Sequence, residues 1–430
     1  MTQSQGLLFP ADIDQLAAAD KASSTFVKNM GLPVHRWFRY SAGFSATWVS
    51  GVIRQFKTTR PTAVFDPFAG SATTLLVADT EGVPSWGIDS HPFVSRIARA
   101  KLAWRSDPDA YLAKTDEVRK IAKKLQPSVS GYPPLIYKCY DEATLADLDC
   151  LRQAYEMVKD GSIESELAWL TLVAILRKTS HAGTAQWQYV LPKKQKRSPQ
   201  DAYSAFYACS RMIYNDMLYG QTVIGPQAKF GEVDARTCAG VPDDYANLVI
   251  TSPPYPNNYD YADATRLEMS FMREITGWGD LQDKVRRHLI RSCSQHVPER
   301  AVDLDEVLAA TELDPIRTSL SDVCHELSEV RKTKGGKKTY HLMIACYFRD
   351  LANVWLSLRR VCSPGADVCF VIGDSAPYGV YVSVIPWLGA LAEAAGFKSH
   401  RFERTRARNV KWKNRKHRVP LQEGRLWVEG

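Results

Sequence analysis

The sequence predicts an α/β protein built on a doubly wound, mostly parallel sheet that carries two mainly helical insertions. Short β-prone runs alternate with helical segments near the N-terminus and again toward the C-terminus, and two of these runs end in an acidic residue. Two long stretches between them show helical periodicity instead. A chain of 430 residues with 45% hydrophobic residues is long enough for one large core with insertions or for two or three domains.

The N-terminal part of the predicted core is a strand–turn–helix unit that occurs twice. The apolar run Thr62–Phe68 predicts a strand, and the small residues 69–71 predict a tight turn before a helical run. A second strand over Val83–Ile88 ends at Asp89, and the helix after it begins at Pro92, because proline suits the first turn of a helix. The sequence therefore predicts a βαβα unit.

The later elements complete the sheet around the two insertions. Residues 106–225 and about 266–339 are expected to be mainly helical, with a loop at Lys193–Pro199 in the first insertion. The remaining core is predicted as strands, helices and a closing pair of strands. In chain order these elements are strands Lys229–Asp234 and Asn247–Ile250, helix Leu342–Val361 closed by Pro364-Gly365, strand Asp367–Ile372, helix Val382–Ala395 stopped by Gly396, and strands Phe397–Phe402 and Gly424–Val428.

Positive charge is gathered into three windows. The windows 193–197, 331–338 and 404–418 hold four, five and eight basic residues and no acidic ones. Outside them the chain has 38 basic and 47 acidic residues, although its overall net charge is +8. Basic patches on an acidic body favour a polyanion such as nucleic acid, while the alternative for each window is a solvated surface.

Membrane and disulfide-rich classes are not supported. The longest apolar run, Ala168–Leu176, is much shorter than the ~20 residues of a membrane span, and the N-terminus does not resemble a signal peptide, so a cytoplasmic location is expected. Nine scattered cysteines include no CxxC pair or zinc-type spacing. We expect buried, reduced thiols and no metal.

Two strand-ending acids surround the first turn. Asp66 ends the first predicted strand, Gly70 allows close approach of the backbone to a ligand, and Ser71 can cap the following helix. Asp89 follows 23 residues after Asp66. This spacing is typical of sites in which the second acid binds the ribose of an adenosine cofactor. Without a strict GxGxxG motif, the alternative is that both acids only cap turns.

A proline pair follows the strand 247–250. Pro253 and Pro254 have no backbone N–H, so the loop keeps its carbonyl oxygens as acceptors. Ser252 and such a carbonyl can accept both N–H groups of an exocyclic amine, while Tyr255 can stack on a flipped base. The alternative is a structural Pro-Pro turn with a core tyrosine.

With these residues the chain resembles the S-adenosylmethionine-dependent amino-group DNA methyltransferases of the N4-cytosine and N6-adenine type. Residues 66–74 (DPFAGSATT) resemble cofactor motif I, and residues 251–255 have the TSPPY form of catalytic motif IV. Weaker similarities are residues 35–52 to motif X, 87–92 to motif II, 232–235 to motif III and 371–375 to motif VI. The resemblance covers about half of the chain and implies a Rossmann-like class I methyltransferase fold.

The resemblance also implies roles for individual residues. The expected S-adenosyl-L-methionine contacts are Asp66, Pro67, Phe68, Ala69, Gly70, Ser71, Asp89, Asp234 and Thr251, with Asp89 on the ribose, Asp66 near the methionine amino group and Asp234 on the adenine. The expected catalytic residues are Ser252, Pro253, Pro254 and Tyr255. Lys193, Lys194, Lys411, Lys413 and Arg415 are expected to bind DNA. The implied reaction is direct methyl transfer with no cysteine nucleophile, because none of the cysteines lies in a Pro-Cys loop.

The chain departs from the family pattern in two ways. Ala72 replaces the second glycine of motif I, and we expect it to take a helical conformation. No separate target-recognition domain follows the core, so target recognition is expected in the insertions, although these could instead support the sheet or a dimer interface. The expected parts are residues 1–105 and 226–262 for the cofactor-binding half and the catalytic loop, 106–225 and 263–340 for the insertions, and 341–430 for the C-terminal core.

Several functions fit this pattern. The first is a site-specific DNA cytosine-N4 methyltransferase acting on a flipped base in double-stranded DNA, with a cognate restriction or defence nuclease as a possible partner. The second is adenine-N6 methylation on the same scaffold. A third is a non-catalytic DNA-binding subunit of a modification complex. RNA or protein glutamine methylation is less favoured, because those families mostly carry Asn or Asp before the two prolines.

Overall fold

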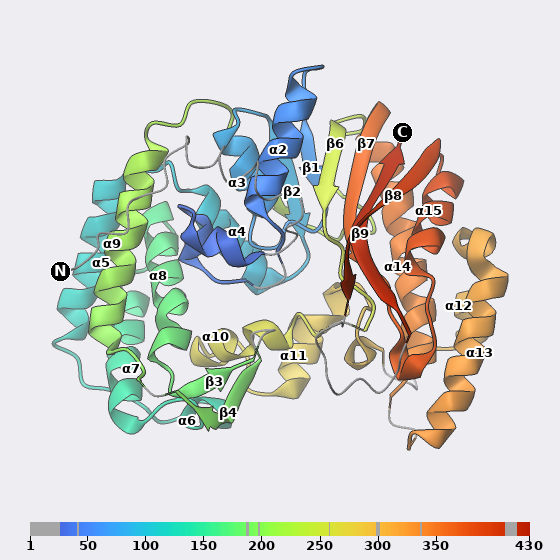
Figure 1. Ribbon diagram of the computed structural model, residues 1–430. Helices are drawn as coiled ribbons and strands as arrows, with labels where there is room; N and C mark the ends of the chain where they lie inside the picture. The colour runs from blue at the N-terminus through green and yellow to red at the C-terminus, as the bar shows by residue number, and fades with distance from the viewer. Residues whose placement is uncertain are drawn as a thin grey trace.

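A computed structural model describes residues 26–40, 43–185, 189–196, 198–257, 259–297, 302–335, 338–408 and 419–430. Within these ranges, seven strands form one sheet in the order β5-β2-β1-β6-β7-β9-β8 (Figure 1). The strands are β1 (Val64–Asp66), β2 (Ser85–Asp89), β5 (Lys229–Glu232), β6 (Ala246–Thr251), β7 (Cys362–Gly373), β8 (Ser399–Arg408) and β9 (Leu421–Glu429). The first five in this order are parallel, and β9 runs antiparallel to both neighbours. The mostly parallel α/β sheet agrees with the prediction.

Both faces of the sheet are buried against helices. On one face Val64, Leu248 and Ile250 pack in a cluster with residues of α2 (Ala46–Lys57) and α3 (Thr73–Thr80). On the other face Phe65 and Val249 pack in the cluster of α14 (Tyr340–Val361) and α15 (Val384–Ala394). Because adjacent residues of a strand point to opposite faces, this alternation confirms a doubly wound sheet.

The first insertion is a helical bundle with a small hairpin. Its helices are α5 (Pro108–Ala122), α6 (Pro134–Tyr137), α7 (Glu142–Val158), α8 (Ile163–Thr179) and α9 (Ala202–Gly220). Between α8 and α9, β3 (Ala182–Thr184) pairs antiparallel with β4 (Val190–Gln195). The loop that was predicted over Lys193–Pro199 is wrong in its first part, because β4 continues through Lys193 and Lys194 to Gln195. The pattern did not predict this hairpin, since Ala-Gly-Thr is a weak strand sequence.

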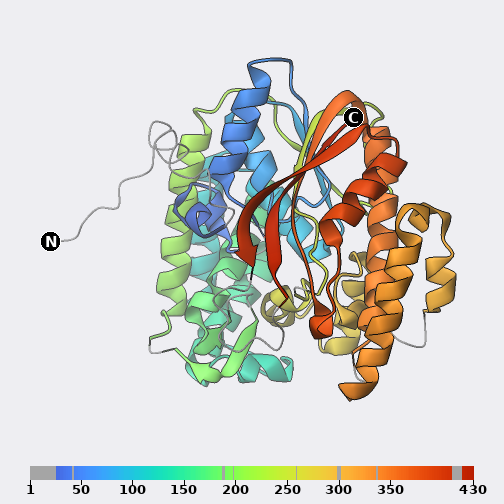
Figure 2. The ribbon, with the colours of Figure 1, turned by 45° about the vertical axis from the view of Figure 1, so that its right-hand side comes forward.

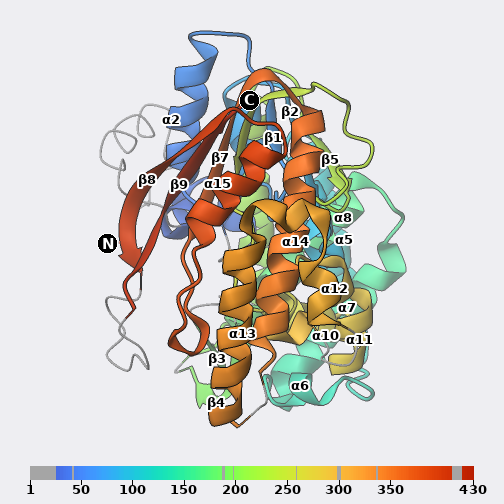
Figure 3. The same ribbon diagram turned by 90° about the vertical axis from the view of Figure 1, so that its right-hand side faces the viewer.

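The second insertion contacts both the first insertion and the C-terminal core. Its helices are α10 (Arg266–Phe271), α11 (Trp278–Lys284), α12 (Leu304–Leu308) and α13 (Arg317–Thr333). Figure 3 shows α12 and α13 beside α14, which agrees with their contacts. On the side of the first insertion, Arg177 of α8 donates to Glu268 of α10 at 2.6 Å, and Glu268 is buried. This ion pair joins the two insertions.

The C-terminal core has the predicted order of elements, but β8 runs to Arg408, so the start of the basic window 404–418, which was expected to be a loop, lies in a strand. A second correction concerns the end of α14. Helix α14 ends at Val361 and β7 begins at Cys362, so Pro364 and Gly365 lie inside the strand and do not form a loop after the helix. The register explains this difference, because Ala246 pairs with Cys362 but Leu248 pairs with Asp367, and the strand bulges between them. Figure 2 shows β8 and β9 as the long closing pair beside β7.

Helix α4 (Pro92–Leu102) begins at the predicted proline. The nine cysteines are free and buried, as expected. Among the described helices, none is long and apolar enough to cross a membrane.

Candidate functional site

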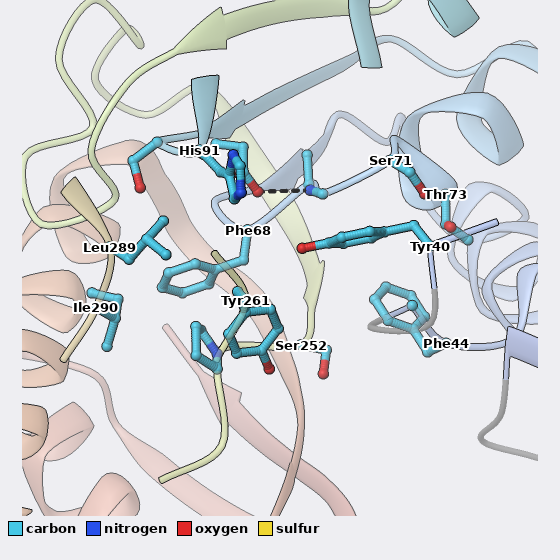
Figure 4. A pocket seen from close by; sticks show the side chains of 16 residues that line it. Tyr40, Phe44, Phe68, Ser71, Thr73, His91, Ser252, Tyr261, Leu289 and Ile290 are labelled. Atoms are coloured by element: carbon cyan, nitrogen blue, oxygen red, sulfur yellow. Dashed lines mark hydrogen bonds between the residues drawn. The ribbon is translucent and has the colours of Figure 1, made fainter. Parts of the chain in front are cut away.

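A cavity opens at the carboxyl ends of β1, β2 and β6, where a doubly wound sheet places its ligands. Its wall includes the turn after β1 (residues 67–72, here the cofactor turn), the loop after β6 (residues 252–262, here the catalytic loop), and residues from the segments 40–44 and 289–290 (Figure 4). The lining residues are Tyr40, Gly43, Phe44, Phe68, Ala69, Gly70, Ser71, Thr73, Asp89, Ser90, His91, Ser252, Pro254, Tyr261, Leu289 and Ile290. Seven of these residues were predicted from the sequence, so the two main motifs meet in one site.

The turn after β1 needs a left-handed backbone at two positions. Gly70 has a φ of +52°, and a Cβ there would lie 3.3 Å from the Tyr40 ring. Ala72 has φ 68° and ψ 31°, which corrects the expectation of an ordinary helical conformation at this residue. An L-residue meets a steric penalty in this region, so the glycine expected at this position of motif I would adopt the conformation more readily than alanine.

Asp89 lies at the end of β2 and faces the cofactor turn. Its carboxylate accepts the Gly70 N–H at 2.9 Å and the His91 N–H at 2.8 Å (Figure 4). Burial raises the pKa of Asp89 to about 6. The side chain therefore holds the turn in place and also presents a carboxylate to the cavity.

Asp66 lies behind the cavity wall. Its carboxylate accepts the Thr251 hydroxyl at 2.6 Å and the Phe68 N–H at 3.1 Å. Burial raises the pKa of Asp66 to about 6. Asp66 thus joins the strand ends from which the cofactor turn and the catalytic loop emerge.

The catalytic loop presents acceptors to the cavity. The Ser252 hydroxyl donates to the carbonyl oxygen of Val371 at 3.0 Å, so its lone pairs remain available to accept hydrogen bonds from a ligand. Pro254 lines the cavity beside Ser252, while Pro253 is buried. Binding of an exocyclic amine by Ser252 and the Pro253 carbonyl oxygen stays a prediction.

Three tyrosines follow in the loop, and Tyr255 and Tyr261 occupy different places. Tyr255 is only 9% exposed, and the guanidinium carbon of Arg408 lies 5.0 Å from its ring centroid. Tyr261 lines the cavity and packs against Tyr259, with ring centroids 4.4 Å apart. Stacking of a base on Tyr255 stays a prediction, because the Arg408 guanidinium covers the ring here.

The structure places other predicted residues away from the cavity wall. The Asp234 carboxylate is paired with Arg236 at 2.6 Å and does not line the cavity, so its contact with an adenine ring stays a prediction. Lys193 and Lys194 are exposed on β4. Lys411, Lys413 and Arg415 lie outside the described residues.

Sequence reasoning missed part of the wall. Leu289 and Ile290 come from the second insertion, and no local motif marks them. Tyr40 and Phe44 lie within the segment that resembles motif X, which was the available signal. Figure 4 shows the Tyr40 hydroxyl reaching toward Phe68, whose ring lies on the side of Leu289 and Ile290.

The segment that carries Leu289 and Ile290 is held to the catalytic loop by a buried network. Asp260 accepts from Arg286 at 2.5 Å and pairs with His296 at 3.2 Å. Cys293 lies near enough to Asp260 and His296 for the three to resemble a metal site. Arg286 already supplies the positive charge that balances Asp260. We therefore infer that Asp260, Cys293 and His296 hold the two loops together and do not bind a metal ion.

Comparisons with known proteins agree with the motifs. No family model and no solved structure matches the chain. The chain is 24% identical over 432 residues to the Type II methyltransferase M.BsoBI of Geobacillus stearothermophilus, across 90% of this chain and 83% of the relative. It is also 24% identical over 405 residues to the Type II methyltransferase M.AvaI of Anabaena variabilis, across 87% of this chain and 81% of the relative. The similarity thus spans both insertions as well as the core.

The buried Asp66 predicts how stability depends on pH. Because its folded pKa lies above the ordinary value of 3.8, the folded state holds the proton more tightly, and stability falls as pH rises from about 4 to 6. Asp66→Asn keeps one side-chain oxygen as a hydrogen-bond acceptor and cannot ionise. The variant should therefore avoid the loss of folding stability, which is of the order of 1–3 kcal/mol. Denaturant unfolding at pH 4.5 and 7.5 should show the variant gaining stability over wild type at the higher pH. Equal differences between the variant and wild type at both pH values would contradict the assignment.

Proposed function

We propose that this chain is a site-specific DNA methyltransferase that moves a methyl group from S-adenosyl-L-methionine to the N4 amino group of a flipped cytosine. The observation that carries the proposal is the meeting of Asp89 and Ser252 in one cavity. The relatives named Type II methyltransferases support the reaction class. By the same similarity we extend the proposal to a restriction-modification system with a cognate nuclease as partner and to the cytoplasm, where its DNA would lie.

The residues present fit the cofactor. The Asp89 carboxylate can accept hydrogen bonds from both ribose hydroxyls, since Asp89 lines the cavity beside Ser90. The turn at Gly70 allows close approach of the backbone, and Phe68, Leu289 and Ile290 offer an apolar wall to the adenine ring. When bound, the cofactor supplies a methyl group on a positively charged sulfur.

The catalytic loop would orient the amine and receive its proton. Ser252 Oγ and the Pro253 carbonyl oxygen accept the two N–H groups, which turns the nitrogen lone pair toward the methyl carbon. A nitrogen–carbon bond forms as the carbon–sulfur bond breaks, and the proton leaves the nitrogen through these acceptors to water. This route needs no covalent enzyme intermediate.

The serine favours cytosine over adenine. A serine hydroxyl is shorter than the Asp or Asn side chain that usually precedes Pro-Pro-Tyr in adenine-specific enzymes. A short hydroxyl suits the cytosine edge, where an acceptor nitrogen lies beside the amino group. Adenine has a similar edge, so the identity of the product decides between the two bases.

The first test concerns the cofactor. Asp89→Ala should weaken binding of S-adenosylmethionine by about 1–3 kcal/mol, because charge-assisted hydrogen bonds to the ribose are lost. Isothermal titration calorimetry measures this change, and Asp243→Ala, which removes an exposed carboxylate elsewhere, serves as the control. An affinity of Asp89→Ala equal to wild type would refute the ribose assignment.

The second test identifies the base. DNA methylated by the wild-type protein is digested, and mass spectrometry should detect N4-methylcytosine. Tyr255→Ala should lose most turnover and retain cofactor binding, whereas Tyr255→Phe keeps the ring and most of the activity. N6-methyladenine alone would contradict the base assignment, and an absence of any methylated base on diverse DNA would favour a non-catalytic subunit.

The third test concerns the basic segment 404–418. Neutralising Lys411, Lys413 and Arg415 together to Gln should weaken binding to all DNA sequences and reduce the slope of log affinity against log salt by up to ~3, since each phosphate contact contributes about 0.9. Fluorescence anisotropy at several salt concentrations measures the slope. An unchanged slope would mean that these residues form a solvated surface only.

A further inference from the structure

The hairpin β3–β4 differs from the rest of the first insertion in shape and charge. It is a two-stranded antiparallel ribbon, drawn in green at the lower edge of the molecule in Figure 1. Thr184, Lys193, Lys194 and Gln195 are exposed on it. The sequence from 181 to 196 contains three lysines and no acidic residue. A ribbon of this kind has the dimensions of the DNA major groove, and its charge is complementary to phosphate.

The hairpin contacts the catalytic loop directly. The Tyr189 hydroxyl accepts the backbone N–H of Asp260 at 2.7 Å, and its ring packs edge-on against Tyr259 with centroids 5.8 Å apart. Tyr259 in turn packs on Tyr261, which lines the cavity. Two successive ring contacts among three tyrosines therefore lead from the hairpin to the site.

The second insertion is less suited to read DNA. Its exposed elements α12, η7 (Thr311–Ile316) and α13 carry seven acidic and three basic residues. Their net negative charge would repel phosphate. The basic window begins only in the last turn of α13. The segment around Leu289 and Ile290 is committed to the cavity wall. This insertion thus builds the site and leaves recognition to the hairpin.

We infer that the β3–β4 hairpin enters the major groove of duplex DNA beside the target base, and that Tyr189 aligns the catalytic loop with the bound DNA. The inference rests on the proposed function and names the element that selects the target. Lys193, Lys194 and Gln195 supply donors to base edges and phosphates. Tyr189 is a positioning residue, because it acts through the backbone of Asp260.

The first experiment measures DNA binding when a hairpin side chain and a DNA acceptor group are removed separately and together. The target is read from the methylated positions in host DNA, and each of its purines is then replaced by the 7-deaza analogue, which lacks the N7 acceptor in the major groove. For wild type, at least one replacement should weaken binding by about 5- to 150-fold. In the variant Lys193→Ala/Lys194→Ala/Gln195→Ala this penalty should fall below about twofold.

The control is Lys123→Ala/Lys124→Ala, an exposed lysine pair in the same insertion, which should keep the full penalty. A penalty that is the same in the hairpin variant and the control, or the lack of any penalty in wild type, would overturn the inference. Failure of wild type to methylate any DNA would instead refute the proposed function, so the two outcomes are distinguishable.

The second experiment tests alignment by Tyr189. Tyr189→Phe removes the hydroxyl acceptor and keeps the ring. We expect kcat to fall about tenfold while KM for DNA and cofactor affinity stay unchanged, since only the loop loses a hydrogen bond. Wild-type kcat, or a rise in KM alone, would contradict the positioning role.

Discussion

The hydrogen bond from Thr251 to Asp66 is the contact on which the site depends. It joins the ends of β1 and β6, which are neighbouring parallel strands. Thr74 supports the same junction by donating to the Ile250 carbonyl at 3.3 Å. Because the cofactor turn leaves β1 and the catalytic loop leaves β6, this buried junction sets the distance between the two loops. The burial that raises the Asp66 pKa also keeps water out of the junction.

Two further buried acids attach the insertions to the core. Asp216 of α9 accepts from the Val34 N–H at 3.0 Å and from the Trp37 indole at 2.8 Å, which fixes the segment that leads to Tyr40. Asp260 connects the catalytic loop to Arg286 and His296 of the second insertion. Both carboxylates are hydrogen-bonded to the segments they hold, so each specifies one arrangement of that segment. Removing each carboxylate from water costs free energy. The insertions are therefore parts of the site's scaffold, and the hairpin adds a surface of its own.

The sequence predicted those features that have local causes. The strand ends at Asp66 and Asp89, the start of α4 at Pro92 and the doubly wound order follow from turn chemistry and hydrophobic period. It did not predict features that depend on distant contacts. Tyr261, Leu289 and Ile290 reach the cavity through the Asp260 network, and the left-handed Ala72 is stabilised by burial in the surrounding core. The burial of Tyr255 beneath Arg408 likewise depends on β8, which lies far away in the chain.

In the proposed function, one cavity brings the cofactor and Ser252 together. A crystal structure with S-adenosylhomocysteine tests it most directly. Both ribose hydroxyls should lie within hydrogen-bond distance of the Asp89 carboxylate, and the sulfur atom should face Ser252 and Pro254. A ligand bound outside this cavity, or bound in it with the sulfur turned away from Ser252, would contradict the account.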